Sequence, residues 1–347
     1  MAAIARYAGA RETVGHRVCF LGGDGQVGDV LVAEGLADRL GLRGGWDLIG
    51  LWRLARLLRH LRPGVVHSHT HALLPTLVAL LMLPGTATVY TENSPRALRP
   101  DWKFRLLYRL LSRVAARFVA LTPTMRGAME RYGAPGARIE VIPNVCAIPR
   151  AATAPGRRAI PTIGVVGRVE DQKRMDLLIE VLGELRRRRI EHRGLVVGGG
   201  TRLAGLIAQA DRLGLGQTVE FAGEQNDVVP WLDRMDLFLM TSAAEPFGIT
   251  ALEAMARRVP VVAMPCPGGL ADLIERGGLL LPDRTVAAAT DAVGGLLQSS
   301  EQRSELQARG QAIAAEHTVE RIFPLLERMY LELAGSPSPP ERQQAIA

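Results

Sequence analysis

Glu245 and Glu253 are the two side chains whose type and spacing first suggest chemistry in this sequence. Glu245 follows the apolar run "LFLMTS", Glu253 comes after seven further residues, and Gly248 lies between them. The run predicts a strand and the stretch "ITALEAMARR" predicts a helix, and glycine permits the sharp turn that joins two such elements. Glu245 would then lie at the end of a strand, and Glu253 within the helix that follows it.

The start of that helix predicts an anion site between the two carboxylates. The free N–H groups at Ile249 and Thr250 would attract a negatively charged group, while Glu245 and Glu253 would accept hydrogen bonds from hydroxyls. A nucleotide sugar has a diphosphate with hydroxyls on both sides, and it fits this arrangement. For Glu253 alone, the alternative is an ordinary glutamate near the start of a helix, stabilised there by the helix dipole.

Arg168 and Lys173 lie in "GVVGRVEDQKRMDLLIEV", where a predicted strand at 162–169 is followed by a loop and a helix. This stretch resembles the corresponding part of the family 4 glycosyltransferases, and the resemblance implies that both cations lie near the same anion site. Negative charge grows on a diphosphate as it leaves a sugar, and fixed cations stabilise that charge without a metal. The alternative for Lys173 is a solvated residue at the start of a helix.

The elements that must position these residues alternate along the second half of the chain. Continuous apolar strands that alternate with helical patterns predict a parallel sheet covered on both faces, and ligands bind at the carboxyl ends of such strands. The first half shows the same alternation more weakly. The predicted strands of the second half are 162–169, 194–200, 218–223, 237–242, 259–264 and 278–282.

The sequence therefore predicts an α/β chain with two doubly wound, Rossmann-like domains that face each other across a cleft. A length of 347 residues suits two domains. The predicted parts are a first domain at 1–146, a Pro-, Ala- and Arg-rich linker at 147–161, a second domain at 162–317, a helix at 318–334 and a disordered tail at 335–347.

Several motifs, in their order and spacing, resemble the retaining glycosyltransferases of family 4, which have the two-domain GT-B fold. The stretch "EPFGITALEAMA" is similar to their E-x7-E motif, and "GVVGRVEDQKRMDLLIEV", "VEFAGEQNDVVPWLDRMDLFLMTS" and "GGLADLIERGGLLL" also match their pattern. The resemblance is close over residues 160–283 and loose over 60–145. It implies an enzyme of polysaccharide biosynthesis that moves a hexose, with retention and without a metal or cofactor. The donor would be a UDP- or GDP-sugar, and the acceptor a hydroxyl of a glycan, a glycolipid or a small molecule.

The resemblance also implies roles for domains and for single residues. The first domain would bind the acceptor and the second the donor. Glu245 would contact the donor sugar and Glu253 the ribose, and the turn at 196–202 would line the base pocket unless it is only a strand-to-helix turn. The implied catalytic set is Arg168, Lys173, Glu245 and His69, and the donor-binding set is Gly167, Gly199, Phe247, Gly248, Ile249, Thr250, Glu253 and Asn93.

The chain departs from the family pattern at three places. It opens with a predicted helix that leads into the family's second strand, so the first domain would lack its first strand and glycine-rich loop, or the true start lies upstream. Asn93 stands where the family has a histidine, and asparagine can hydrogen-bond a hydroxyl but carries no proton. Arg258 replaces a glycine, which would cost about 1 kcal/mol if that position has a positive φ.

Three histidines, His67, His69 and His71, alternate along a predicted strand and would share one of its faces. Zinc ligation is an alternative, but the side chains would have to reach a common point beyond the strand end, and we expect no metal. His69, at the end of the strand, is expected to point into the cleft.

A second glycine pattern is the GxGxxG of Gly23, Gly25 and Gly28, with Asp47 further along the chain. In a dinucleotide site, a strand would end just before such an acidic residue, which would bind the ribose. A helical pattern follows Asp47 instead, so we expect no nicotinamide cofactor.

Positive charge is concentrated in the first half of the chain. The net charge is +7, and residues 1–150 alone carry an excess of ten positive charges. The segment 96–118 predicts a basic amphipathic helix that contacts an anionic membrane, and the alternative is a core-facing helix with a solvated arginine stripe. Its arginines recur every four residues, at Arg105, Arg109, Arg113 and Arg117.

Other partners and compartments are less favoured. No zinc-finger spacing or RNP-like aromatic box supports binding of nucleic acid. The most apolar run, Ala72–Leu83, is shorter than the ~20 residues of a membrane span, and the N-terminus lacks the pattern of a secretory signal. The three cysteines match no disulfide or metal spacing. We therefore expect a cytoplasmic protein that is peripheral on the inner face of the membrane.

Two other functions remain open on the sequence. The missing strand and Asn93 would suit a catalytically weak partner protein that binds a nucleotide sugar and supports another transferase. A sugar-nucleotide epimerase of similar architecture would need acid–base side chains in the cleft, and the sequence offers no convincing set of them.

Overall fold

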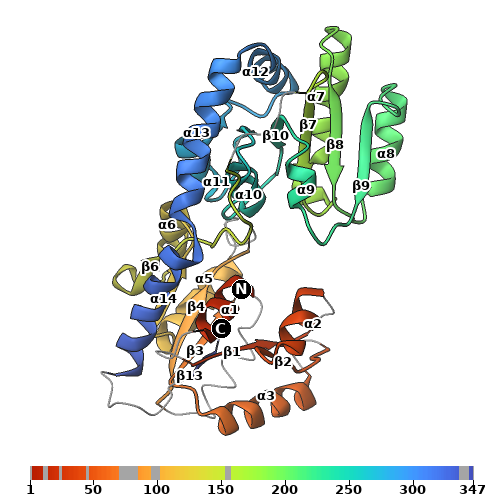
Figure 1. Ribbon diagram of the computed structural model, residues 1–347. Coiled ribbons are helices and arrows are strands. Elements are labelled where there is room, and N and C mark those ends of the chain that lie inside the picture. The colour runs from red at the N-terminus through yellow and green to blue at the C-terminus, as the bar shows by residue number, and fades with distance from the viewer. Residues whose placement is uncertain are drawn as a thin grey trace. The chain divides into compact units, whose positions relative to one another are not determined.

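The chain forms two compact units, each built around a parallel sheet (Figure 1). Unit 1 comprises Met1–Ala147 together with Thr318–Ala347, and unit 2 comprises Ile148–His317. The computed structural model describes residues 2–10, 15–22, 26–43, 47–69, 85–94, 102–152, 158–335 and 344–346. The predicted fold class, α/β with two doubly wound Rossmann-like domains, is confirmed.

The sheet of unit 2 has six parallel strands in the order β12-β11-β10-β7-β8-β9. Its central strands are buried from end to end because they are continuous apolar runs covered on both faces. The chain leaves β7 in one direction through β8 to β9, and then returns to place β10 on the other side of β7. The strands are β7 (Thr162–Val166), β8 (Arg193–Val197), β9 (Val219–Gly223), β10 (Leu237–Met240), β11 (Val261–Ala263) and β12 (Leu279–Leu280).

This reversal of strand order puts helices on both faces of the sheet of unit 2, because parallel crossovers are right-handed. It also makes the boundary between β7 and β10 the point where a ligand is expected, outside the carboxyl ends of the two strands. The helices are η4 (Asp171–Lys173), α7 (Met175–Arg187), α8 (Leu203–Arg212), α9 (Val229–Leu232), α10 (Ile249–Ala256), α11 (Leu270–Gly277), α12 (Val286–Gln298) and α13 (Ser300–Glu316).

The sheet of unit 1 has seven parallel strands in the order β2-β1-β13-β3-β4-β5-β6. The strand β13 comes from the tail that we expected to be disordered, and it pairs with β1 on one side and β3 on the other. The expectation of a disordered tail is therefore wrong for these three residues. The strands β1 and β3 do not pair with each other, and β13 supplies backbone partners to both. The strands are β1 (Gly15–Phe20), β2 (Ala37–Arg39), β3 (Val65–His69), β4 (Ala87–Thr91), β5 (Arg117–Ala120), β6 (Ile139–Val141) and β13 (Gln344–Ile346).

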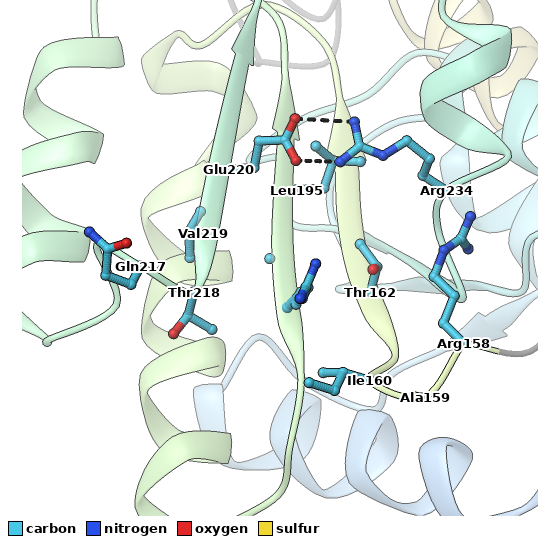
Figure 2. A pocket seen from close by; sticks show the side chains of 12 residues that line it. Arg158, Ala159, Ile160, Thr162, Leu195, Gln217, Thr218, Val219, Glu220 and Arg234 are labelled. Carbon is cyan, nitrogen blue, oxygen red and sulfur yellow. Dashed lines mark hydrogen bonds and ion pairs between the residues drawn. The ribbon is translucent and has the colours of Figure 1, made fainter.

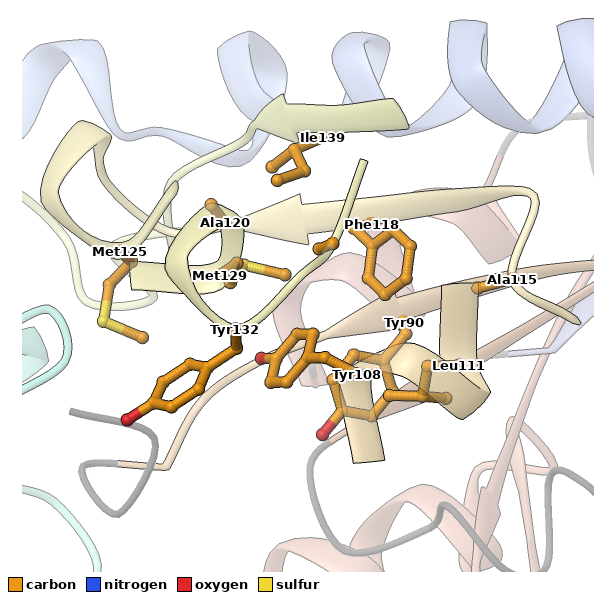
Figure 3. Close-up of a cluster of buried hydrophobic side chains, with 11 residues drawn as sticks. Tyr90, Tyr108, Leu111, Ala115, Phe118, Ala120, Met125, Met129, Tyr132 and Ile139 are labelled. Carbon is orange, nitrogen blue, oxygen red and sulfur yellow. The ribbon is translucent and has the colours of Figure 1, made fainter. Parts of the chain in front are cut away.

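Alternating side chains of the strands in unit 1 pack on helices of opposite faces. Val65 and Val89 contact α14, whereas Val66 contacts α3. Tyr90 of β4 packs with Tyr108 of α5 in an aromatic cluster (Figure 3). The helices are α1 (Ala2–Gly9), α2 (Gln26–Ala33), α3 (Leu48–Leu61), α5 (Trp102–Val114), α6 (Pro123–Arg131), η3 (Gly136–Arg138) and α14 (Val319–Ala334).

Two details of unit 1 bear on the sequence predictions. Arg117 was predicted on the amphipathic helix, but that helix ends at Val114 and Arg117 begins β5. Asp47 caps α3 by accepting a hydrogen bond from the N–H of Gly50, so it is a helix cap rather than a ribose ligand at a strand end. Gly23, Gly25, His71 and the run Ala72–Leu83 lie outside the described residues.

The end of α10 is a turn whose geometry favours glycine, and Arg258 occupies it. The N–H of Val259 donates to Ala254 O and the N–H of Arg258 donates to Met255 O, which is the Schellman pattern of helix ends. Arg258 has a φ of +60°, the left-handed region in which a side chain is unfavourable.

Arg258→Gly is therefore expected to raise the free energy of unfolding by about 1 kcal/mol. Urea denaturation monitored by circular dichroism measures this change. The control is Arg212→Gly, which places the same glycine at the last helical residue of α8 and is expected to lower stability. An equal loss of stability in both variants would contradict the explanation.

Candidate active site

The loops that follow β7 and β10 are fastened to each other by three hydrogen bonds. The N–H of Ala243 donates to Gln172 O at 2.7 Å, and the side-chain amide of Gln172 donates to Ala244 O at 2.9 Å. The hydroxyl of Thr241 donates to Lys173 O at 3.0 Å. These bonds hold η4 against the start of the E-x7-E segment, so Lys173 and Glu245 are fixed at one place although 72 positions separate them.

Lys173 and Glu245 form an ion pair at the carboxyl ends of β7 and β10. Lys173 Nζ lies 2.7 Å from Glu245 Oε2, and the two side chains are 18% and 11% exposed. The sequence predicted both residues in the site, but not that they would bind each other. Lys173 is also one of only two lysines in the chain, against 40 arginines. A lysine ammonium is a compact charge with three donors, whereas a guanidinium is a broad planar fork.

Gly248 joins the strand end to α10 in the way that the sequence predicted. Its φ of +99° is the left-handed conformation, and a side chain there would begin only 2.6 Å from Leu270 Cδ1. The side chain of Phe247 is buried and faces the ring of His317, with 5.6 Å between the ring centroids. Only the backbone of Phe247 and Gly248 is therefore left to meet a ligand, while Ile249 is 43% exposed at the first position of α10.

Glu253, on the next turn of α10, is a carboxyl group without a partner inside the described part of unit 2. Burial raises its pKa from the ordinary 4.5 to about 7. The hydroxyl of Thr250, one turn earlier, is buried and likewise finds no hydrogen-bond partner among the described residues. Buried polar groups are normally satisfied, so this turn of α10 is suited to a ligand that brings hydrogen-bond donors and acceptors.

Glycines in the loop after β8 allow it to touch the loop after β7. A Cβ on Gly198 would lie 1.9 Å from the carbonyl oxygen of Gly167, so no other residue fits there. The N–H of Val169 donates to Gly199 O at 2.8 Å and ties the two loops together. Arg168, between these contacts, is exposed. Gly199 also neighbours Glu224, since a Cβ on this glycine would lie 3.5 Å from Glu224 Cβ.

Two residues of this site were not predicted. The guanidinium of Arg284 donates to the carbonyl oxygens of Ser242 and Pro265, both at 2.8 Å, and so clamps the loops after β10 and β11. Cys266 lies near Glu245, and burial first, then that carboxylate, raises the pKa of the thiol to about 11. The thiol therefore stays protonated. A lone arginine or cysteine carries no periodic signal, so neither could be predicted from the sequence.

His69 and Asn93 lie together in unit 1, at the carboxyl ends of neighbouring strands. The side-chain amide of Asn93 donates to His69 Nδ1 at 3.0 Å. Burial lowers the pKa of His69 to about 4, so the ring is neutral. Because Nδ1 accepts, the ring proton belongs on Nε2, which has no partner within the described residues. His69 can therefore donate one hydrogen bond to a ligand.

His67, next to this pair on β3, forms hydrogen bonds with both of its ring nitrogens inside the core. His67 Nδ1 lies 2.6 Å from Tyr330 Oη, and its Nε2 lies 2.6 Å from Thr91 Oγ1. His67 also stacks on His69 with 4.6 Å between ring centroids, which confirms that alternate residues of β3 share a face. Across the described parts of both units, no three His, Cys, Asp or Glu side chains are grouped as metal ligands.

Glu92 fixes the segment that carries Asn93. The hydroxyls of Tyr90 and Tyr108 both donate to Glu92 Oε2 at 3.1 Å, and the N–H of Ser94 donates to Oε1 at 2.7 Å. Burial and the nearby carboxylate raise the pKa of both tyrosines, so they remain donors. This buried network could not be predicted from the sequence, because it depends on contacts between a strand and a later helix.

The raised pKa of Glu253 predicts a pH dependence of stability. Between pH 4.5 and about 7, the folded protein keeps a proton on Glu253 that the unfolded chain has already released, so the free energy of unfolding falls as the pH rises over this range. Glu253→Gln should abolish this fall, a difference on the order of 3 kcal/mol above pH 7. Denaturation at several pH values checks it, with the exposed Glu275→Gln as the control. A profile that Glu253→Gln leaves unchanged would contradict the assignment.

Two family models match the chain, one in each unit. Residues 9–146 match the family described as Glycosyltransferase Family 4, and residues 157–312 match the family described as Glycosyl transferases group 1. The chain is 32% identical over 249 residues, 64% of its length, to the D-inositol 3-phosphate glycosyltransferase of Nocardia farcinica, and spans only about half, 54%, of that protein. It is 38% identical over 144 residues to the lipopolysaccharide core biosynthesis mannosyltransferase LpcC of Rhizobium leguminosarum, with 40% and 38% of the two chains covered.

The fold is shared with solved structures. Anabaena HepE, in a crystal structure in complex with UDP-glucose, aligns with a TM-score of 0.80 at 20% identity, over 95% of this chain and 94% of that one. The two family matches follow each other along the chain and fall one in each unit. Unit 1 therefore matches the Glycosyltransferase Family 4 model, unit 2 matches the Glycosyl transferases group 1 model, and the two-domain fold is shared with this solved structure.

Proposed function

We propose that the protein is a retaining glycosyltransferase that transfers a hexose from a UDP- or GDP-sugar to a hydroxyl of a glycan, a glycolipid or a small molecule. The observation that carries this proposal is the ion pair of Lys173 and Glu245, placed where the strand order reverses and next to the N-terminus of α10. The similar proteins support the class of reaction, since one is named a D-inositol 3-phosphate glycosyltransferase and the other a lipopolysaccharide core biosynthesis mannosyltransferase.

In the proposed reaction, the donor separates Lys173 from Glu245 and binds both side chains. The diphosphate binds Lys173, Arg168 and the free N–H groups of α10, and hydroxyls of the sugar donate to the freed carboxylate of Glu245. The bond between the anomeric carbon and the phosphate oxygen breaks, and its electron pair leaves on the phosphate. The acceptor oxygen bonds to the same face of the sugar, and its proton passes to the departing phosphate. The two cations supply the stabilisation of charge that this step requires, without a metal or cofactor.

The remaining site residues would hold the rest of the donor. Glu253 and Thr250 are the unsatisfied groups of α10, and the carboxylate of Glu253 would accept hydrogen bonds from ribose hydroxyls. The loop at Gly167 and Gly199, beside Glu224, would meet the base. In unit 1, the Nε2–H of His69, oriented by Asn93, would donate to a hydroxyl of a bound ligand.

Lys173→Ala and Glu245→Ala are each expected to reduce turnover by about 100-fold or more, about 2.7 kcal/mol of transition-state stabilisation. Lys173→Arg keeps the charge but not the compact ammonium, so it should also be impaired. The exposed Arg187→Ala on α7 is the control. Turnover is measured as release of nucleoside diphosphate from whichever UDP-, GDP- or ADP-sugar stabilises the protein in a thermal-shift screen, where a ligand at ~100 times its Kd adds about 2.7 kcal/mol.

The same assays separate the alternative functions. Full turnover in both alanine variants would overturn the proposed mechanism. Nucleotide binding without transfer to any acceptor would favour the catalytically weak partner protein, and an epimerised sugar after incubation with donor alone would favour the epimerase.

We also propose that unit 1 docks on an anionic membrane through α3 and α5. Both helices pack on the same face of the sheet, since Val66 contacts α3 and Tyr90, on the same side of the neighbouring strand, contacts α5. Neither helix contains an acidic residue. Each exposes a tryptophan, with Trp52 59% and Trp102 70% exposed.

The exposed face of α5 is not the purely solvated arginine stripe of the alternative interpretation. The helix buries Tyr108 and Leu111 in the core, yet Leu106 and Leu110 also face outward beside the arginines. Exposed tryptophan and leucine flanked by arginine suit the boundary between anionic headgroups and acyl chains. No helix in the described ranges is long and apolar enough to cross a membrane. We propose that this docking is peripheral, on the inner face, where a lipid-linked acceptor would be found.

Replacement of Arg105, Arg109 and Arg113 by glutamine is expected to weaken binding to anionic vesicles by roughly 100-fold, at about 1 kcal/mol per arginine. Flotation with phosphatidylglycerol and phosphatidylcholine vesicles measures the difference. The matched control replaces three arginines of unit 2, Arg187, Arg202 and Arg212, and removes the same charge. Equal binding to both kinds of vesicle, or an equal loss in the control, would contradict the docking proposal.

A further inference from the structure

A cavity of about 500 Å³ opens at the amino ends of β7, β8 and β9 (Figure 2). Its lining includes the first residues of all three strands, Thr162, Arg193 and Val219. Lys173 and Glu245 follow the carboxyl ends of the strands, so the cavity lies at the opposite end of the sheet of unit 2. Its volume falls within the range of small-molecule sites.

Three arginines and one glutamate are the charged residues that line the cavity, so its charge is positive. The carboxylate of Glu220 is bound to the guanidinium of Arg234 (Figure 2). The Cζ atom of Arg234 also lies 4.8 Å from the centroid of the Trp231 ring. This pair is neutral and satisfied. The other two arginines, Arg158 and Arg193, therefore determine what the cavity attracts.

Arg158 is held in place but keeps an unused donor. Its Nη2 donates to Asp233 O at 2.9 Å. Its Nη1 is buried without a hydrogen-bond partner in the described chain, and the nearest carboxylate oxygen, of Asp236, is 3.9 Å away. That carboxylate already accepts a hydrogen bond from the N–H of Thr162 at 2.8 Å. The arrangement leaves one oriented N–H group without an acceptor.

Arg193, at the start of β8, lines the same cavity with an exposed side chain. Within the ranges that the structure covers, it forms no ion pair. Thr218 and Gln217 add polar groups, and Ile160 and Leu195 add apolar surface. Guanidinium groups bind phosphate oxygens in a paired geometry, and a polar and apolar wall beside them can hold the body of a small ligand.

We propose that this cavity is a second ligand site, which binds the phosphate group of a small phosphorylated molecule of about the size of a sugar phosphate. Arg158 and Arg193 contact the phosphate, and Thr218 and Gln217 contact hydroxyls of the ligand. The site shares no residue with the proposed donor site. The two sites can therefore be occupied together, and the inference does not depend on the proposed function.

Calorimetric titration of the full chain with glucose 6-phosphate and with inorganic phosphate tests the proposal. The titrations are repeated in the presence of saturating UDP and in Lys173→Ala, which removes a cation of the donor site. The expected result is saturable binding of one equivalent that neither condition abolishes. Tighter binding of the sugar phosphate than of inorganic phosphate would show that the walls of the cavity contribute.

Arg193→Gln is expected to weaken this binding at least tenfold without lowering the melting temperature, because its side chain is exposed. Arg158→Gln should have a similar effect on binding, and Arg187→Gln on α7 serves as the control for loss of an exposed arginine. Binding that Arg193→Gln leaves unchanged, that UDP abolishes, or that never saturates would overturn the proposal.

Discussion

The ion pair of Lys173 and Glu245 is the interaction on which the organisation of unit 2 depends. Each charge is largely buried, and a buried charge without a partner is strongly destabilising. The loops after β7 and β10 must therefore meet closely enough for the two side chains to bind each other. In this structure, the charges of Lys173 and Glu245 neutralise each other. In the proposed function, a ligand that separates the pair brings a negative group for Lys173 and hydrogen-bond donors for Glu245, and a sugar diphosphate would carry both.

The surroundings of the pair are built for close and fixed contact. Gly198 lets the loop after β8 touch the backbone of Gly167, and Gly248 lets α10 begin against Leu270. Arg284 donates hydrogen bonds to backbone carbonyls of the loops after β10 and β11. Such contacts leave the loops little freedom, so the positions of the charged groups are set before any ligand arrives, and binding need not order them.

Much of this arrangement could be predicted from sequence, for reasons that differ between residues. The strands of unit 2 were recognisable because they are continuous apolar runs. Glu245 and Gly248 were found because loops at the carboxyl ends of such strands carry ligands, and Lys173 was found through the resemblance to family 4 glycosyltransferases. Arg284, Cys266 and the carboxylate of Glu92 could not be found, because their roles arise from contacts between segments distant in sequence. The predicted amphipathic helix was right in composition but too long, since arginine spacing alone does not show where a helix ends and β5 begins.

The position of β13 and α14 has a consequence for how the chain folds during synthesis. Unit 2 is one continuous segment, whereas unit 1 is assembled from residues on both sides of it. Residues 1–147 leave the ribosome first, but the sheet of unit 1 gains β13 and the cover of α14 only after all of unit 2 has been made. Until then, β1 and β3 present unpaired edges, which invite pairing with other chains. The domain that begins first is thus the one that finishes last, and during that interval it is the part of the protein most in need of a chaperone.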